Sequence, residues 1–215
     1  MTMMKRLAAL VLVLAMLLTL AACGTANTGG TVDEPKNNTA ADTADPAPDD
    51  TTPESTGGKV LVAYFSATGH TKTIAEYLQT ALDADLYEIV PQEPYTDADL
   101  DYNTDGCRAN REQNDDSARP AISGGVEDMA RYDVVFIGYP IWWGQAPKIV
   151  YTFLESYDFS GKTIVPFCTS GGSGIDGSLG GLQALASDAD WLTGQRFSSG
   201  ASEEEVQSWV DHLGL

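Results

Sequence analysis

Apolar residues fall along this chain in two patterns that alternate with each other. Three short runs, at 60–65, 134–139 and 163–168, are apolar without polar alternation, and weaker runs lie at 84–90 and 191–197. Uninterrupted apolar runs of this length are typical of strands that are covered on both faces of a sheet. The five runs therefore predict five strands.

Between several of these runs, apolar residues recur every three or four positions, as they do on one face of a helix. Such stripes cover 74–82 and 149–154, and the second begins near Pro147, a residue favoured in the first turn of a helix. At 202–205, Ser-Glu-Glu-Glu is a capping box before another stripe. This alternation predicts a doubly wound α/β domain with a five-stranded parallel sheet and helices on both faces.

Pro166 lies within the predicted strand at 163–168. It cannot donate a hydrogen bond to a neighbouring strand, so we expect a bulge or an unpaired position there.

The first residues have the composition of an export signal. Two basic residues at 5–6 precede an apolar stretch at 7–18, which is too short to span a membrane. The sequence Leu-Ala-Ala-Cys that ends at Cys23 resembles the lipobox of bacterial lipoproteins, and an ordinary secretory signal with a chance cysteine is the alternative. The resemblance implies that residues 1–22 are a signal peptide. It also implies that Cys23 carries a lipid anchor that holds the protein on the extracytoplasmic face of the cell membrane.

A polar segment separates this cysteine from the first apolar run. Residues 24–58 hold seven acidic residues and almost no large apolar side chain, so we expect 23–58 to be the lipidated cysteine and a disordered linker. Residues 59–215 are predicted to be the folded domain and carry 24 acidic and 9 basic residues. That charge disfavours nucleic acid as a partner and suits a cationic one. The two cysteines of this domain, Cys107 and Cys168, are predicted to be free thiols, and a disulfide between them, which an extracytoplasmic location would allow, is the alternative.

The loop that follows the first predicted strand has the composition of a phosphate site. It reads Ser-Ala-Thr-Gly-His-Thr at 66–71 and leads directly into a predicted helix. The N-terminus of a helix leaves backbone N–H groups unpaired and carries partial positive charge, so hydroxyls and amides there can surround a phosphate. This loop is not a Walker A motif, and its single glycine rules out a Gly-x-Gly-x-x-Gly fingerprint at 66–71, which leaves a cradle for one phosphate monoester. An ordinary turn between strand and helix with a threonine cap is the alternative.

Two further loops should meet the first at the same edge of the sheet, because ligands of doubly wound folds bind at the carboxyl ends of the strands. Pro-Ile-Trp-Trp-Gly-Gln at 140–145 follows the run at 134–139, and Thr-Ser-Gly-Gly-Ser-Gly at 169–174 follows the run at 163–168. The former offers large aromatic faces, and the latter offers flexible backbone that can approach a polar ring edge closely. Together with the hydroxyl-rich loop, they predict a ligand with one phosphate and a flat heteroaromatic ring.

With these three loops, the chain from 59 to about 213 resembles the flavodoxin family, in particular its bacterial branch with a Pro-Ile-Trp-Trp-Gly motif. The resemblance implies a sheet of strand order 2-1-3-4-5 and FMN as the cofactor. The phosphate of FMN would bind to Ser66, Thr68, Gly69, His70 and Thr71. Its isoalloxazine ring would lie against Pro140, Ile141, Trp142, Trp143 and Gly144. Its pyrimidine edge and ribityl side would contact Thr169, Ser170, Gly171, Gly172 and Ser173.

The two tryptophans of this motif are adjacent, so they should not share one environment. We expect one to face the flavin and the other to pack on the domain.

The resemblance also implies a function. We expect an electron-transfer flavoprotein that is tethered outside the cytoplasmic membrane and serves an unknown redox partner, which is basic or membrane-bound. An FMN-dependent reductase that passes electrons from NAD(P)H to quinone-type acceptors is one alternative. A non-redox binding module on the same scaffold is another. The acidic surface would oppose negative charge on the reduced flavin, and it therefore predicts a low potential.

Residues 91–122 form a long polar connection after the second predicted strand. Connections of this length are usually functional or disordered. The stretch from Asp101 to Glu112 matches the calcium loop of EF-hands at its ligand positions, although Arg108 stands where an aliphatic residue is usual. We expect a flap over the ligand, with Tyr102 as a second aromatic face. A calcium loop and a solvated surface loop are the alternatives.

Overall fold

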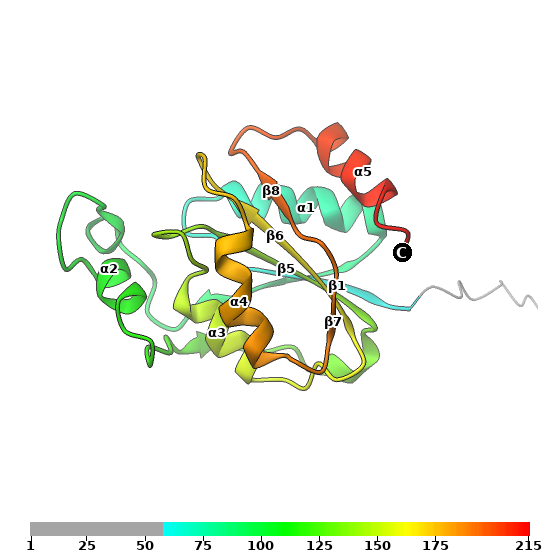
Figure 1. Cartoon of the computed structure of the whole chain (residues 1–215), viewed down its shortest axis with the longest axis horizontal. Helices are drawn as coiled ribbons and strands as arrows, with labels where there is room; N and C mark the ends of the chain where they lie inside the picture. Colours follow the sequence, from blue (N-terminus) through cyan, green and yellow to red (C-terminus); the bar gives the residue numbers. More distant parts are fainter. Residues whose placement is uncertain (1–57) are drawn as a thin grey trace, which may run out of the picture. The chain divides into compact units, whose positions relative to one another are not determined.

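The computed structural model describes residues 58–215 (Figure 1). The predicted signal peptide, Cys23 and all of the predicted linker except Gly58 lie outside the described residues. The main sheet contains β1 (Val60–Tyr64), β2 (Asp85–Glu88), β5 (Val134–Pro140), β6 (Thr163–Thr169), β7 (Asp190–Trp191) and β8 (Gln195–Phe197). Its pairings are parallel and its order is β2-β1-β5-β6-β7, with β8 also beside β6. Because β7 and β8 share the fifth position, the predicted order 2-1-3-4-5 is confirmed.

Helices cover both faces of this sheet, as predicted. On one face α1 (His70–Leu82) packs against α5 (Glu203–Asp211). On the other face α3 (Lys148–Glu155) packs against α4 (Asp176–Leu185) (Figure 1). The sheet therefore has two separate hydrophobic cores, one beneath each pair of helices.

Successive residues of β1 contribute to the two cores alternately. Leu61 and Ala63 belong to the core beneath α3 and α4, whereas Val62 and Tyr64 belong to the core beneath α1 and α5. All four side chains are buried. The strand is thus covered on both faces, which is why its sequence shows no polar alternation.

Helix α4 was not predicted from the sequence. Gly177, Gly180 and Gly181 fall within it, and a glycine in a helix costs about 1 kcal/mol relative to alanine. Gly181 lies against α3, where an added Cβ atom would come within 2.5 Å of the hydroxyl oxygen of Tyr151. The glycine that weakens the helical pattern of the sequence therefore permits close packing of α4 on α3.

Pro166 lies in β6, next to the edge position of the sheet that β7 and β8 share. It pairs in register with β5, while the side on which it lacks an N–H faces the fifth strand position. On that side Ile164 pairs with Trp191 and Phe167 pairs with Gln195, so three residues of the fifth strand lie opposite two residues of β6. The predicted bulge is confirmed, and it divides the fifth strand into β7 and β8.

The long connection begins and ends on a small second sheet. β3 (Val90–Pro91) pairs antiparallel with β4 (Ile122–Ser123), and η1 (Asp97–Leu100) and α2 (Arg108–Gln113) lie between them. The apolar run at 84–90 is therefore divided between two sheets. A final short helix, η2 (Met129–Arg131), leads into β5. In the part of the chain that the structure describes, no helix is long and apolar enough to cross a membrane.

Both cysteines of the domain are buried free thiols, as predicted. Cys168 lies in β6, and Cys107 immediately precedes α2. Burial raises the pKa of the Cys168 thiol to about 12. This thiol is therefore uncharged at neutral pH and is not an activated nucleophile.

Gly138 of β5 lies against the ring of Phe167 in β6, and a Cβ atom added at Gly138 would overlap this ring. We expect Gly138→Ala to lower the free energy of unfolding by about 1–3 kcal/mol, because the core must shift to accept the methyl group. Gly180→Ala is the matched control. An added Cβ at Gly180 would meet nothing within 4 Å, so alanine in this helix should raise the free energy of unfolding by about 0.5–1 kcal/mol. Urea unfolding measures both, and equal effects would contradict the packing of β5 on β6.

Candidate functional site

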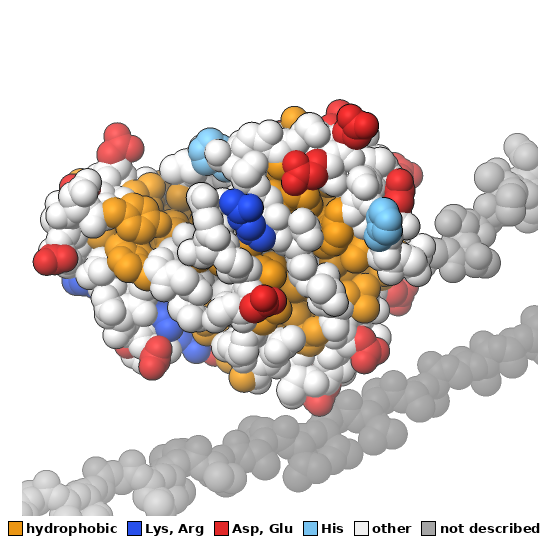
Figure 2. All heavy atoms as spheres, turned by 45° about the horizontal axis from the view of Figure 1, so that its top comes forward, with side chains coloured by type: hydrophobic (Ala, Val, Ile, Leu, Met, Phe, Trp, Pro, Cys, Tyr) orange, Lys and Arg blue, Asp and Glu red, His pale blue; other side chains and the backbone are white. Residues whose placement is uncertain are grey.

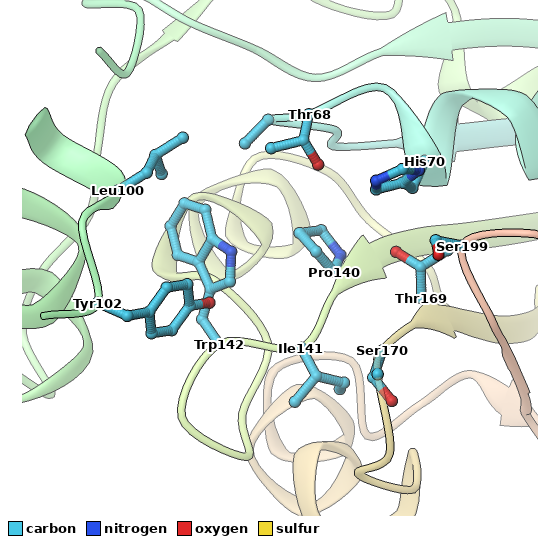
Figure 3. Close-up of a pocket in the computed structure, with 12 residues that line it drawn as sticks. Thr68, His70, Leu100, Tyr102, Pro140, Ile141, Trp142, Thr169, Ser170 and Ser199 are labelled. Carbon is cyan, nitrogen blue, oxygen red and sulfur yellow. The ribbon is translucent and has the colours of Figure 1, made fainter. Parts of the chain in front are cut away.

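A cavity of about 220 Å³ lies at the carboxyl ends of β1, β5, β6 and β8 (Figure 3). The loops that follow these strands line it, together with part of the long connection. The lining residues are Ala67, Thr68, His70, Leu100, Tyr102, Pro140, Ile141, Trp142, Thr169, Ser170, Gly171 and Ser199. The three loops that the sequence analysis singled out therefore meet in one place.

The loop after β1 is arranged to receive an anion. The hydroxyl oxygen of Ser66 is buried and has no hydrogen-bond partner among the described residues. Gly69, with a φ of 88°, immediately precedes α1, and no described side chain caps this helix N-terminus or places a carboxylate in its first turn. The N–H groups and the positive end of the helix dipole therefore remain available. A buried unpaired hydroxyl beside such a helix start fits a phosphate oxygen.

The side chain of Thr71 is used within the fold. It is buried, and its hydroxyl shares a hydrogen bond of 2.8 Å with the hydroxyl of Thr169 at the end of β6. The resemblance assigned both residues to the cofactor. Thr169 lines the cavity, whereas Thr71 lies behind its wall. The bond between them fixes the start of α1 against the end of β6.

A tight turn at the end of β5 carries the two adjacent tryptophans. Backbone hydrogen bonds of 2.9 Å run in both directions between Trp142 and Gln145. The central residues, Trp143 and Gly144, have φ values of 46° and 78°, which makes this a type I′ turn. A left-handed conformation suits glycine but costs about 1–2 kcal/mol for a residue with a side chain. The turn therefore stores strain at Trp143, at the edge of the cavity.

The two tryptophans occupy different environments, as predicted. Trp142 is buried, lines the cavity and packs edge-on against the rings of Phe65 and Tyr95, with ring centroids 5.5 and 5.2 Å apart. Trp143 is 41% exposed and lies against Tyr102, with ring centroids 4.5 Å apart. We expected one tryptophan to face the ligand and the other to pack on the domain. Trp142 both lines the cavity and packs on the domain, whereas Trp143 lies outside the cavity. The two predicted roles therefore fall on one residue.

The ring of Tyr95 joins the long connection to Trp142. Its hydroxyl donates a hydrogen bond to Glu112. The guanidinium of Arg108 lies 4.2 Å from the centroid of the tyrosine ring, and its Nε donates to Glu112 at 2.7 Å. Burial and the carboxylate of Glu112 raise the pKa of Tyr95, so its hydroxyl stays protonated as a donor. These contacts anchor the base of the connection.

Helix α2 is also tied to the tryptophan turn. The side-chain amide nitrogen of Gln113 donates to the backbone oxygens of Trp142 and Ala146, at 3.1 and 3.2 Å. The connection is thereby placed so that Leu100 and Tyr102 reach the cavity. Tyr102 lies where the predicted flap requires it.

The acidic stretch that resembles a calcium loop is engaged within the protein. The carboxylate of Asp101 accepts hydrogen bonds from the backbone and side-chain nitrogens of Asn103 and from the hydroxyl of Thr104. Glu112 is held by the contacts described above. Among residues 58–215, no three His, Cys, Asp or Glu side chains are grouped as metal ligands. The contacts of Asp101 and Glu112 therefore favour the flap over the calcium loop.

Most of the predicted site residues line the cavity. These are Thr68, His70, Tyr102, Pro140, Ile141, Trp142, Thr169, Ser170 and Gly171. Others lie near it without lining it, namely Ser66, Gly69, Thr71, Trp143, Gly144, Gly172 and Ser173. Three further lining residues, Ala67, Leu100 and Ser199, were not predicted from the sequence. Ser199 follows β8 and could have been predicted as the residue at the carboxyl end of the fifth strand. No sequence signal marks Leu100.

The two ends of the cavity differ in polarity. Figure 3 shows His70, Thr169 and Ser199 at one end, near the start of α1, and the rings of Tyr102 and Trp142 at the other. No acidic residue of the described chain lines the cavity. The cavity therefore fits a ligand with an anionic end and a flat apolar end, which is the character of FMN.

Comparison with known proteins identifies the family. The family described as flavodoxin matches residues 59–213, and the chain belongs to it. The chain is 47% identical to a presumed flavoprotein of known structure from Bacteroides eggerthii, over 74% of this chain and 99% of that one, with a TM-score of 0.70. A presumed flavoprotein from Bacteroides uniformis is 45% identical over 72% of this chain and 99% of its own, with a TM-score of 0.69.

A more distant relative has been crystallised with FMN. This flavoprotein from Lactobacillus acidophilus is 26% identical over 72% of this chain and 99% of its own, with a TM-score of 0.55. No curated protein matches the chain.

Proposed function

We propose that this protein binds FMN in the cavity and carries electrons as a lipid-anchored flavoprotein outside the cytoplasmic membrane. The observation that carries the proposal is the polarity of the cavity, with an unpaired hydroxyl and an uncapped helix N-terminus near one end and aromatic rings at the other. The FMN complex of the Lactobacillus acidophilus relative supports this choice of ligand. Bound FMN supplies the redox chemistry, while the protein supplies binding, orientation and electrostatics.

The phosphate of FMN belongs at the start of α1. There the hydroxyl of Ser66 has an unused hydrogen bond to donate, and the first turn of the helix presents free N–H groups. Thr68 and His70 line the same part of the cavity and add further polar groups. The absence of acidic residues from the first turn of α1 avoids repulsion of the phosphate.

The flavin ring belongs at the apolar end. Trp142 and Tyr102 offer ring surfaces that exclude water from the bound flavin. Gly171 lines the cavity without a side chain, and an added Cβ there would meet nothing within 4 Å. The backbone of this loop can therefore approach the polar edge of the ring closely.

The surface around the cavity suits electron exchange with a partner. Tyr102 and Trp143 are exposed large hydrophobic side chains, and Figure 2 shows hydrophobic side chains gathered at the end of the molecule that the long connection forms. On the same face, acidic side chains are more numerous than basic ones. An apolar patch with an acidic surround favours a partner that is basic or membrane-bound.

Ser66→Ala should weaken FMN binding without destabilising the ligand-free protein. The hydroxyl has no partner within the described chain, so its loss should leave the free energy of unfolding unchanged or slightly raised. A hydrogen bond to a charged group contributes about 1.5–3 kcal/mol, so the affinity for FMN should fall about tenfold or more. Titration followed by flavin fluorescence measures this affinity, with the exposed Ser156→Ala as the control. Equal affinities of the two variants would refute the phosphate placement, and a wild-type protein that rejects FMN would refute the function.

An electron carrier and a reductase differ in how fast they oxidise NADH or NADPH. The FMN-loaded protein should oxidise NADH or NADPH in the presence of a quinone no faster than free FMN at the same concentration. Absorbance at the nicotinamide band measures this rate. Saturable oxidation well above the rate of free FMN would favour the reductase instead.

Membrane tethering depends on Cys23 in this proposal. In a bacterial host, the full-length wild-type chain should fractionate with membranes, whereas Cys23→Ser should be found in the soluble fraction. Cys107→Ser is the matched control, because serine is favoured at the start of a helix and should preserve both the fold and the anchor. Membrane association that survives Cys23→Ser would rule out the lipid anchor.

A further inference from the structure

Arg196 lies directly behind the wall of the cavity. It belongs to β8 and pairs with Cys168 of β6. Its guanidinium donates two hydrogen bonds to Ser170, from Nε to the hydroxyl oxygen at 3.3 Å and from Nη2 to the backbone oxygen at 3.0 Å. Ser170 itself lines the cavity. A single residue therefore separates a permanent positive charge from the ligand site.

The charge of Arg196 is not neutralised by a carboxylate in the described part of the chain. Arg108, Arg119 and Arg131 each form an ion pair, whereas Arg196 takes part in none of those that residues 58–215 contain. The lining of the cavity, described above, holds no acidic residue either. The field of this guanidinium therefore acts on the cavity without an adjacent opposing charge.

The loop that Arg196 holds is the one expected to meet the pyrimidine edge of the flavin. When a flavin accepts two electrons and one proton, the proton binds at N5 and a negative charge remains on this edge, around N1 and the neighbouring carbonyl oxygen. A cation beside the edge stabilises that charge, and charge near N1 is one means by which a protein adjusts the electronics of the cofactor.

We infer that Arg196 stabilises the anionic reduced form of FMN and so opposes the low potential that the acidic surface predicts. This inference rests on the proposed binding of FMN. The acidic residues of the surface act through solvent, where salt screens charges beyond about 10 Å. Arg196 acts through one hydrogen-bonded residue of the cavity wall, where screening is much weaker.

The first test measures the two-electron midpoint potential of the FMN-loaded protein by titration with dithionite. Arg196→Gln keeps an amide donor but removes the charge, and it should lower the preference for reduced over oxidised FMN at least tenfold, which is a fall of about 30 mV. Arg196→Lys keeps the charge and should produce less than half of this shift. Arg131→Gln is the matched control, because it removes the same charge from an ion pair with Asp85 at the opposite edge of the sheet, and it should leave the potential unchanged.

Sulfite provides a second readout, in which the wild-type protein can also be compared directly with free FMN. Its sulfur donates an electron pair to N5 of the oxidised flavin, so that an N–S bond forms and the pair of the broken ring double bond becomes negative charge at the pyrimidine edge. The adduct should therefore be more stable on the wild-type protein than on free FMN. Arg196→Gln should weaken the adduct at least tenfold, as followed by bleaching of the flavin absorbance.

The outcomes separate this inference from the proposed function. A shift in Arg196→Gln no larger than in Arg131→Gln, or a wild-type adduct weaker than that of free FMN, would overturn the inference. If Arg196→Gln does not fold, the comparison of wild-type protein with free FMN decides. If both Arg196 variants bind oxidised FMN more weakly at an unchanged potential, the guanidinium only anchors the loop, and the inference is wrong while FMN binding stands. A wild-type protein that rejects FMN refutes both.

Discussion

A hydrogen bond of 2.8 Å between the hydroxyls of Thr71 and Thr169 holds the two halves of the cavity in place. Both side chains are buried, so if one moved, the other would be left unpaired at a cost of about 1–3 kcal/mol. Through this bond, the first turn of α1 is fixed relative to the end of β6. The separation of the anion-binding end from the polar edge of the ring site is therefore set by the fold rather than by the ligand.

The opposite wall of the cavity depends on how the long connection packs against a strained turn. Tyr95 packs on Trp142, and Gln113 binds the backbone of the same residue, so the connection and the turn hold each other. Trp143 keeps a left-handed conformation within this arrangement and lies against the ring of Tyr102. Conformational strain at a cavity rim persists only where the surrounding structure enforces it. The contacts of the connection provide that enforcement here.

Much of the fold could be predicted because burial leaves a direct trace in the sequence. The runs at 60–65, 134–139 and 163–168 are covered on both faces and so contain almost no polar residue. Helix α4 left no such trace, because its glycines serve close packing rather than helix formation. The site loops could be predicted because each follows a strand at its carboxyl end. The positions of Leu100 and Arg196 could not be predicted, because only the tertiary structure shows that Leu100 of the long connection lines the cavity and that Arg196 of β8 binds Ser170 from behind the cavity wall.

Three loops converge on one mononucleotide in the proposed complex, and a crystal structure of the protein with FMN tests this most directly. We predict a phosphate oxygen within hydrogen-bond distance of the hydroxyl of Ser66 and of N–H groups in the first turn of α1. We also predict the flavin ring between Trp142 and the loop that begins at Ser170. A phosphate bound elsewhere, or a cavity filled by the side chains of Trp142 and Tyr102 while FMN stays in solution, would contradict the account.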